Sequence, residues 1–526
     1  MSKKTPESAA PEEEKRVDKK TEYIHKMIAF LTSEEVAYHS RGERTYIDTR
    51  PLKGKKLINL ESSEFRSFLM RLAKKMDGLL LRHADADLIT EHVLFHAQEV
   101  AKPLSSDARA MQQGKKYLIN PGWENDKLIV IEPGKQWAET EQKEWLFEPM
   151  TAKMRMVVPE PREATSFPDY LRRGIADFGE HHCLLAVTCA TMLLPADFVH
   201  PFIVFTGNQA RGKSTTMKLL LQLVDPYDKG ELMSVGEDMR DIIALCRGRH
   251  SIALDNVSKL PFDEDMLSKM YSGGLFATRK MATNSELSEV ETPRLRVLMN
   301  GIGNAFSRSD LMSRCIFIEH PALVTMKPDG TEYFAPLSVV EDRWRAILPD
   351  ALGSLLAALS AGLKIFVDNG ELKDKVSGSR FVEYCVIGEC IAEAMGFEKG
   401  MFTAQVDLAS ESQKETAIEA DDTAQLILAW LTGERAQRSD AQGDFFSTTD
   451  FVQQDEYIVS PSDLFGEIRS LAAQRGYSVY SLKWLASTKS FSQAVQRSKK
   501  NIENGGWEFI QLAGGEKKRH YKFHKK

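Results

Sequence analysis

A glycine-flanked loop near the middle of the chain carries the residue types that bind phosphate groups. It matches the pattern G-x-x-x-x-G-K-S and reads Gly207, Asn208, Gln209, Ala210, Arg211, Gly212, Lys213, Ser214, Thr215. In such a loop the backbone N–H groups surround a pyrophosphate, the lysine reaches the β- and γ-phosphates, and the serine hydroxyl can ligate Mg²⁺. The alternative is a chance match on an ordinary strand–turn–helix. The flanking residues argue against it, and we expect a nucleoside triphosphate with Mg²⁺.

A second group of polar residues follows the apolar run that starts at His250. This run ends in Asp255 and Asn256. A carboxylate at the C-terminal end of a strand can hold Mg²⁺ through water. The alternative interpretation is that Asp255 only caps a turn. Asn256 stands where many ATPases with a phosphate-binding loop of this kind carry a glutamate that acts as a base. Its amide can orient water but cannot take a proton, so we expect slow or differently assisted hydrolysis.

A third apolar run, Leu295 to Met299, ends in Asn300. This amide can hydrogen-bond the γ-phosphate or the attacking water, although an Asn-Gly turn at a strand end is also common. The pair Arg308 and Arg314 follows. A guanidinium offered to the γ-phosphate of a neighbouring subunit would be an arginine finger, for which Arg314 is preferred, and two surface salt-bridge arginines are the alternative.

A glycine-rich stretch between the second and third runs presents Arg279 and Lys280. As a loop or hairpin that projects into a central pore, it could grip nucleic-acid phosphates. A solvated turn explains the same residues equally well, and the sequence favours neither.

The elements that must position these groups follow from the apolar runs. Strands are expected over Phe202–Thr206, 250–255 and 295–300, and a helix from Thr216 onwards. Their order predicts an α/β P-loop core over residues 163–404, with helices at 351–366 and 380–395 that could form a lid.

The rest of the chain divides by composition. We expect a disordered tail at 1–20, an α+β accessory or oligomerisation domain at 21–162, and a polar, acidic linker at 405–422. The second of these contains two hairpin patterns, Arg44–Asp48 with Lys56–Leu60 and Lys116–Asn120 with Lys127–Ile131.

Residues 423–526 resemble a winged helix, since helices are followed by a short basic hairpin. Such modules place a helix in the major groove and the wing on the backbone. The alternative is a basic tail around a protein-interaction domain. The expected phosphate contacts are Lys499, Lys500, Lys517, Lys518 and Arg519.

Bulk properties exclude several classes of protein. Hydrophobic residues make up 42% and charged residues 27%, as in soluble globular proteins, and the net charge is −6. The six cysteines form no C-x-x-C pair, so a zinc site or disulfide framework is not expected. The longest apolar run, Cys183 to Leu194, is too short to cross a bilayer, and no apolar leader is present at the N-terminus. We expect a cytoplasmic protein without a membrane partner.

Together, these motifs resemble an AAA+ ATPase and, more narrowly, the superfamily 3 helicase-like ATPases of phages, plasmids and other mobile elements, often encoded beside primases. The resemblance covers roughly residues 165–410. It implies a hexameric ring that binds ATP and Mg²⁺ through Lys213, Ser214 and Asp255, with Asn300 as sensor 1 and Arg314 or Arg308 as the finger in trans. It also implies that Arg279 and Lys280 face DNA and that Arg380 is a weaker candidate for sensor 2. Ala210 departs from the glycine frequent in the family's loop, which leaves the loop geometry open.

The expected function is an ATP-dependent DNA translocase or helicase that acts as a ring in replication of a mobile element, beside a primase or other replication proteins. The alternative is a nucleotide-switched assembly protein, either a helicase loader or a phage-defence nucleic-acid sensor. Asn256 keeps this alternative open, because a switch needs nucleotide binding more than turnover.

Overall fold

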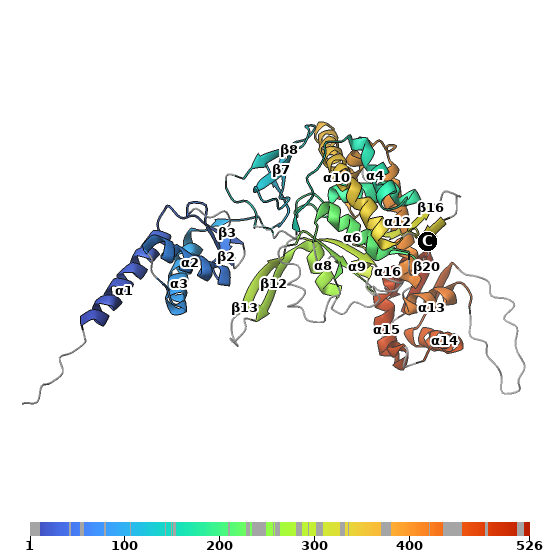
Figure 1. The fold of residues 1–526 in the computed structure, drawn as a ribbon. Coiled ribbons are helices and arrows are strands. Elements are labelled where there is room, and N and C mark those ends of the chain that lie inside the picture. The colour runs from blue at the N-terminus through green and yellow to red at the C-terminus, as the bar shows by residue number, and fades with distance from the viewer. Residues whose placement is uncertain are drawn as a thin grey trace, which may run out of the picture.

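The structure is a computed structural model of the 526-residue chain (Figure 1). It describes residues 11–41, 44–52, 57–77, 80–105, 107–142, 144–148, 150, 154–208, 211–227, 232–233, 249–255, 257, 264–279, 287–292, 294–300, 309–326, 332–334, 336–369, 380–419, 421–434, 455–478, 482–512 and 520–526.

The centre of the molecule is a five-stranded parallel sheet in the order β10-β11-β14-β9-β15. The three strands expected from the sequence are present as β9 (Phe202–Thr206), β11 (Ser251–Leu254) and β14 (Arg296–Asn300), and β10 (Leu232–Met233) and β15 (Cys315–Glu319) form the edges. Nearly every residue of β9, β11, β14 and β15 is buried, as expected for parallel strands covered on both faces.

Alternate residues of the strands enter two different cores. Ile203 and Phe205 face a large core shared with α4 (Phe167–Gly174), α5 (His182–Thr191) and α6 (Lys213–Val224). Phe202 and Val204 face a smaller core shared with α8 (Glu264–Ser272) and α9 (Ser309–Met312). The sheet is therefore the middle layer of a three-layer α/β arrangement, which agrees with the α/β fold expected for this part.

The helices expected as a lid are α10 (Leu337–Asp368) and α11 (Val382–Ala394), and both belong to the large core. Trp344 of α10 is buried and donates its indole N–H to the carbonyl of Leu219 on α6, at 3.0 Å. By length and composition α10 could cross a membrane, but 67% of its apolar window is buried within the protein, as in a core helix.

The range 21–162 holds two sheets. The first has the order β3-β2-β1-β4 and packs with three helices, whereas the second is the meander β5-β6-β7-β8. Both expected hairpins are confirmed, as the antiparallel pairs β2–β3 and β6–β7. The elements are α1 (Pro11–Leu31), β1 (Tyr38–Arg41), β2 (Arg44–Asp48), β3 (Leu57–Asn59), α2 (Ser63–Asp77), α3 (His83–Val100), β4 (Lys102–Pro103), β5 (Ala110–Gln113), β6 (Lys116–Ile119), β7 (Lys127–Ile131) and β8 (Ala138–Glu141).

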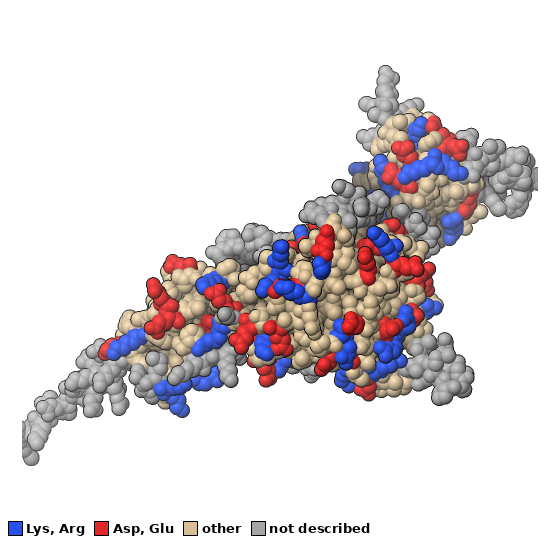
Figure 2. Space-filling view, turned by 90° about the horizontal axis from the view of Figure 1, so that it is seen from above, with Lys and Arg blue, Asp and Glu red and all other residues tan. Residues whose placement is uncertain are grey.

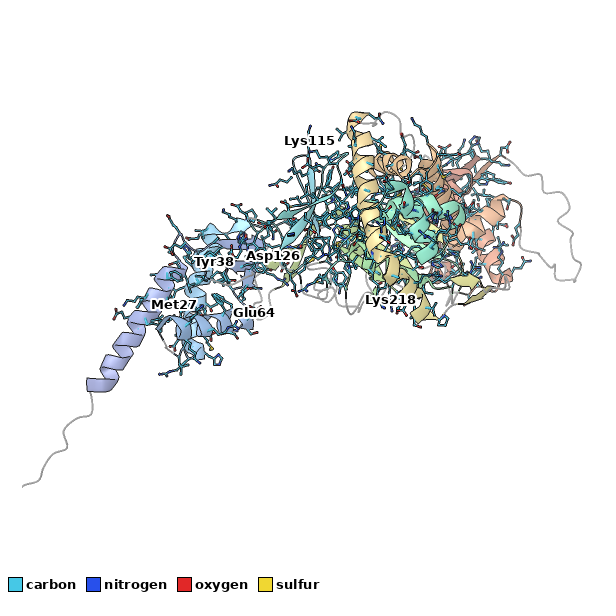
Figure 3. All side chains as sticks on the ribbon, turned by 45° about the horizontal axis from the view of Figure 1, so that its top comes forward. Met27, Tyr38, Glu64, Lys115, Asp126 and Lys218 are labelled. Atoms are coloured by element: carbon cyan, nitrogen blue, oxygen red, sulfur yellow. The ribbon has the colours of Figure 1, made fainter. Side chains whose placement is uncertain are left out.

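The two sheets have different surroundings. In Figure 1 the first lies in an arm that projects from the core, and Figure 2 shows acidic and basic side chains interspersed over the face in view. The second sheet contributes Ile119, Ile129 and Ile131 to the large core. The turn after β7 is fixed to α10, because the Ser360 hydroxyl donates to the carbonyl of Glu132 at 2.9 Å. Lys115, which precedes β6, and Asp126, which precedes β7, are labelled in Figure 3.

Two sequence-based boundaries are corrected. Helix α1 already begins at Pro11, within the expected tail, because its later turns are anchored by the buried side chains of Tyr23, Met27 and Leu31. Most of the expected linker lies in α12 (Met401–Glu419), in which Val406 and Ala409 are buried in the core.

The C-terminal residues form a separate hydrophobic core with a three-stranded antiparallel sheet in the order β18-β20-β19. Its elements are α13 (Asp422–Leu431), β18 (Glu456–Val459), α14 (Pro461–Gln474), α15 (Thr488–Arg497), α16 (Lys499–Asn504), β19 (Trp507–Leu512) and β20 (His520–Lys525). The expected helices followed by a hairpin are confirmed. Two further hairpins, β12 (Gly274–Arg279) with β13 (Leu287–Thr292) and β16 (Val324–Met326) with β17 (Glu332–Phe334), extend from the central unit.

Candidate nucleotide site

The glycine-flanked loop joins the end of β9 to the start of α6, as the sequence predicts. Gly207 has φ of 112° and Gly212 has φ of 95°, a region that favours glycine. A Cβ atom on Gly212 would also lie 2.3 Å from Leu323 Cδ1. Backbone conformation and space therefore both require glycine at this position. Gln209 and Ala210 lie outside the described residues.

Lys213 is the first residue of α6, and its side chain folds back over the loop. Its Nζ donates to the carbonyls of Gly207 at 2.8 Å and Asn208 at 2.7 Å. Burial, and then the charge of Arg211, lower the pKa of Lys213. A phosphate group in the loop would offer this ammonium a negative partner, which would favour its charged form.

Ser214, Asp255 and Asn300 meet beside the loop. The hydroxyl of Ser214 donates to Asp255 Oδ1 at 2.7 Å, and Asn300 Nδ2 donates to the same hydroxyl oxygen at 2.9 Å. Strand order explains the convergence, because β14 lies between β9 and β11 and all three end at the same edge of the sheet. The loop amide of Val257 also donates to the Asn300 carbonyl at 2.8 Å. Asn256 lies outside the described residues.

The oxygen atoms at this junction fit Mg²⁺. The Ser214 hydroxyl and the Asp255 carboxylate are hard ligands, and Mg²⁺ is usually bound by one or two protein oxygens together with substrate phosphates and water. Among the described residues no group of three or more His, Cys, Asp or Glu side chains could hold a metal by itself. Phosphate oxygens of a bound nucleotide and water would complete the coordination of the ion.

His320, which directly follows β15, also holds the loop in place, and the sequence did not predict this role. His320 is buried; its backbone N–H donates to the Thr206 carbonyl at 3.0 Å, and its Nε2 lies 2.7 Å from Thr216 Oγ1 on α6. Arg211 donates to the His320 carbonyl at 3.3 Å. Burial lowers the pKa of His320 to about 4. The missed signal is positional, since His320 follows its strand just as Asp255 and Asn300 follow theirs.

Arg314 lies at the opposite edge of the sheet. Its carbonyl accepts from the N–H of Phe202, the first residue of β9, at 2.9 Å. Its guanidinium carbon lies 5.5 Å from the ring centroid of Tyr271. The five residues of β9 separate this edge from the phosphate loop by about 16 Å. Arg314 is therefore too far from the loop of its own chain to act there in cis, and Arg308 lies outside the described residues.

Arg380 lies beside Arg314, because its Nη1 donates to the hydroxyl of Ser313. Like Arg314, Arg380 therefore lies away from the loop of its own chain, and its role as sensor 2 stays a prediction. Arg294 approaches the same edge and donates to the carbonyls of Ser272 at 2.9 Å and Asp197 at 2.6 Å. Three arginines thus surround Tyr271 at the edge of the sheet away from the loop.

The expected nucleic-acid contacts are only partly described. Arg279 ends β12 in a hairpin that projects away from the parallel sheet in Figure 1. Lys499 and Lys500 are exposed on α16, where Lys499 lies 3.7 Å from Glu503. The other expected contacts lie outside the described residues, namely Lys280, Lys517, Lys518 and Arg519.

Comparison with known proteins gives one family and a group of solved structures. No curated protein matches the chain. Two apo structures of the NrS-1 C-terminal region are similar. One has 13% identity, a TM-score of 0.39 and coverage of 92% of this chain and 95% of that chain. The other has 12% identity, a TM-score of 0.36 and the same coverage. Residues 174–385, which include the loop, Asp255, Asn300 and Arg314, match the family described as Actinomycete integrative conjugative element replication protein.

Proposed function

We propose that this protein is an ATP-dependent DNA translocase or helicase that works in the replication of a mobile genetic element. The observation that carries the proposal is the meeting of Lys213, Ser214, Asp255 and Asn300 at one edge of the parallel sheet. In this proposal the core is of the AAA+ type. The match of residues 174–385 to a family of integrative-element replication proteins supports replication as the setting.

Each residue at this edge has a distinct role in the proposed reaction. The loop amides and Lys213 bind the β- and γ-phosphates of ATP, and Ser214 and Asp255 hold Mg²⁺. Asn300 would orient the attacking water, and the hydrogen bond from its amide to the Ser214 hydroxyl, which puts it beside the loop, supports this role. The bound Mg²⁺ would neutralise charge that develops on the phosphate oxygens. His320 keeps the start of α6 in place through Thr216.

The distance between the loop and the arginines supports assembly into a ring. Since Arg314 and Arg380 lie at the far edge of the sheet, they could reach a γ-phosphate only in a neighbouring copy. We therefore propose a homo-oligomeric ring, with a hexamer as the expected form, in which these arginines act in trans. The β12–β13 hairpin that bears Arg279 would then contact DNA.

The proposal is tested by ATP hydrolysis with and without DNA. Wild-type protein should hydrolyse ATP faster when DNA is added, and Lys213→Ala should abolish turnover because the β- and γ-phosphates lose their cation. The matched control is Lys218→Ala, which removes a lysine from the same helix beyond the loop. Equal turnover by wild type and Lys213→Ala would refute the assigned site.

A second function has one observation in its favour, the asparagine at position 256. If hydrolysis is slow for lack of a proton acceptor, the protein would act as a nucleotide-switched assembly protein, such as a helicase loader or a nucleic-acid sensor. Wild-type protein that binds ATP and oligomerises on it, but neither turns over nor displaces a strand, would favour this function over the motor.

A further inference from the structure

A cavity of about 610 Å³ lies between the second N-terminal sheet and the helices beside it. Near one end of this interface, Ile119, Ile129 and Ile131 fill the space between the sheet and the large core. Near the turn that joins β5 to β6, the cross-strand partners Gln112 and Tyr117 line the cavity instead. Binding pockets typically have volumes of about 300–1,000 Å³ and often lie between domains. The size and the position of this cavity are therefore those of a binding pocket.

Apolar side chains form most of the opposite wall. Phe366 of α10 and Val386 of α11 line the cavity together with Phe198, which lies between α5 and β9. The apolar surface continues at the mouth, where Val382 lines the cavity and is 38% exposed, and where Val367, next to Phe366, is 55% exposed. Exposed apolar side chains that gather beside a pocket are a feature of interaction sites. The cavity is thus suited to an apolar group that continues into a longer molecule outside.

The charged side chains at the cavity are both acidic. Asp197 and Glu383 line it and are exposed, and no lysine or arginine is among its described lining residues. In the part of the chain that the structure describes, neither carboxylate has a hydrogen bond or an ion pair. Arg294 donates to the backbone carbonyl of Asp197 and not to its carboxylate. The mouth therefore favours a positively charged group.

Strand β5 leaves backbone groups unpaired beside the cavity. It is an edge strand, because the order β5-β6-β7-β8 gives it β6 as its one neighbour in the sheet. The Arg109 carbonyl accepts from the Asn120 amide at 2.7 Å, so alternate residues from Arg109 onwards face β6. The backbone N–H and C=O groups of Gln112 consequently face the open edge. An extended chain can pair with such an edge as an added strand.

We infer that this cavity binds an extended segment of a partner protein in which a lysine or arginine stands next to an aromatic or large aliphatic residue. The apolar side chain enters the cavity. The basic side chain lays its stem along Val382 and places its charged end beside Asp197 and Glu383. The backbone of the segment pairs with Gln112 at the edge of β5.

The test starts from a library of random peptides displayed on phage, which is selected for binding to the full-length chain. Peptides with a basic residue next to an aromatic or large aliphatic residue should be enriched. Synthetic peptides of this class are then titrated onto the full-length chain, and binding is measured by fluorescence anisotropy. The measurement needs no ATP, and the residues of the nucleotide site do not line the cavity, so a failure of the proposed function leaves the result unaffected.

Two kinds of variant test the site. Gln112→Trp and Val382→Trp fill the cavity from opposite walls at exposed positions, and each should weaken peptide binding by about 30-fold or more. The double variant Asp197→Asn/Glu383→Gln should weaken binding by about 2- to 30-fold, because each exposed ion pair contributes modestly. It should also make binding less sensitive to salt.

Matched controls alter exposed side chains away from the cavity. Val158→Trp adds an indole elsewhere, and Glu91→Gln/Asp407→Asn removes two carboxylates that do not line the cavity. Both should bind the peptides like wild type. A selection that enriches no peptides of the basic and apolar class would overturn the inference. So would enriched peptides that bind Gln112→Trp and Val382→Trp, each shown by urea unfolding to be folded, as tightly as they bind wild type.

Discussion

Replacing Arg109 by methionine would leave a buried carboxylate without its counter-charge. Arg109 precedes β5, and Asp225 directly follows the last residue of α6. The Nε and Nη2 atoms of Arg109 donate to Asp225 Oδ1, at 2.9 and 2.6 Å. Both side chains are fully buried. Asp225 Oδ2 also accepts from the backbone amides of His250 at 3.1 Å and Ser251 at 2.7 Å, where β11 begins. One ion pair therefore joins the second N-terminal sheet to the loop helix and to the strand that leads to Asp255.

The expected cost is large because neither charge can reach water. Removing one partner of a buried pair costs about 3–5 kcal/mol, whereas replacing both by neutral groups is often tolerated. Arg109→Met should therefore lower the free energy of unfolding by about 3–5 kcal/mol. The double variant Arg109→Met/Asp225→Asn should lose less than the sum of the single variants, by about 2 kcal/mol. The assay is urea unfolding together with hydrogen exchange of the β11 amides.

The control is a surface pair of the same type. Arg172 Nη1 lies 2.6 Å from Asp169 and its Nε lies 3.0 Å from Asp177, and all three side chains are about half exposed. Arg172→Met should therefore cost less than about 1 kcal/mol. If the loss in the double variant equals the sum of the losses in the Arg109→Met and Asp225→Asn variants within about 0.5 kcal/mol, the two side chains are not coupled and the prediction is refuted. A loss for Arg109→Met no larger than that for Arg172→Met would refute the argument from burial.

The remaining predictions concern packing, pH and the arginines. A Cβ on Gly353 would lie 1.6 Å from the Glu160 carbonyl oxygen, so Gly353→Ala should lower the free energy of unfolding by about 1–3 kcal/mol or more. Gly466 lies within α14 and has open space around it, so Gly466→Ala should raise the free energy of unfolding by about 1 kcal/mol. Burial lowers the pKa of His320 in the folded protein to about 4, below its value of about 6.5 in the unfolded chain. As the pH falls, the unfolded chain therefore binds the proton first. Between pH 7.5 and 5 this residue should lower the free energy of unfolding by about 2 kcal/mol. His320→Gln should remove that part of the pH dependence measured by urea unfolding, and an unchanged slope would contradict it. Arg314→Ala and Lys213→Ala should each lose ATP hydrolysis alone but regain part of it when mixed, because an intact loop can then meet the intact Arg314 of a neighbouring copy; no recovery on mixing would exclude action in trans.

The phosphate loop and its strands could be predicted from the sequence because their signals are local. The loop has a fixed spacing of glycines and a lysine, and β9, β11 and β14 are short runs of apolar residues that each end in a polar side chain. Parallel strands that lie side by side then bring Ser214, Asp255 and Asn300 together.

Other features depend on contacts between distant parts of the chain. Arg109 and Asp225 are 116 positions apart, and the carboxylate of Asp107 and His250 Nδ1, 2.9 Å apart, are separated by 143 positions. Single charged residues carry no pattern that reveals such partners. The position of Arg380 beside Ser313 could not be predicted either, because the placement of α11 decides which edge of the sheet it reaches. The two corrected boundaries have the same origin, since a few buried side chains hold charged segments in α1 and α12.

The central claim is that the edge formed by Lys213, Ser214, Asp255 and Asn300 uses ATP to move DNA strands. Its most direct test is displacement of a labelled strand from a partial duplex by the wild-type protein with ATP and Mg²⁺, beside Asp255→Asn. We predict displacement that requires ATP hydrolysis and is lost in Asp255→Asn, because the Mg²⁺ ligand is weakened. Wild-type protein that binds ATP and oligomerises but displaces no strand would contradict it, as would displacement by Asp255→Asn at the wild-type rate.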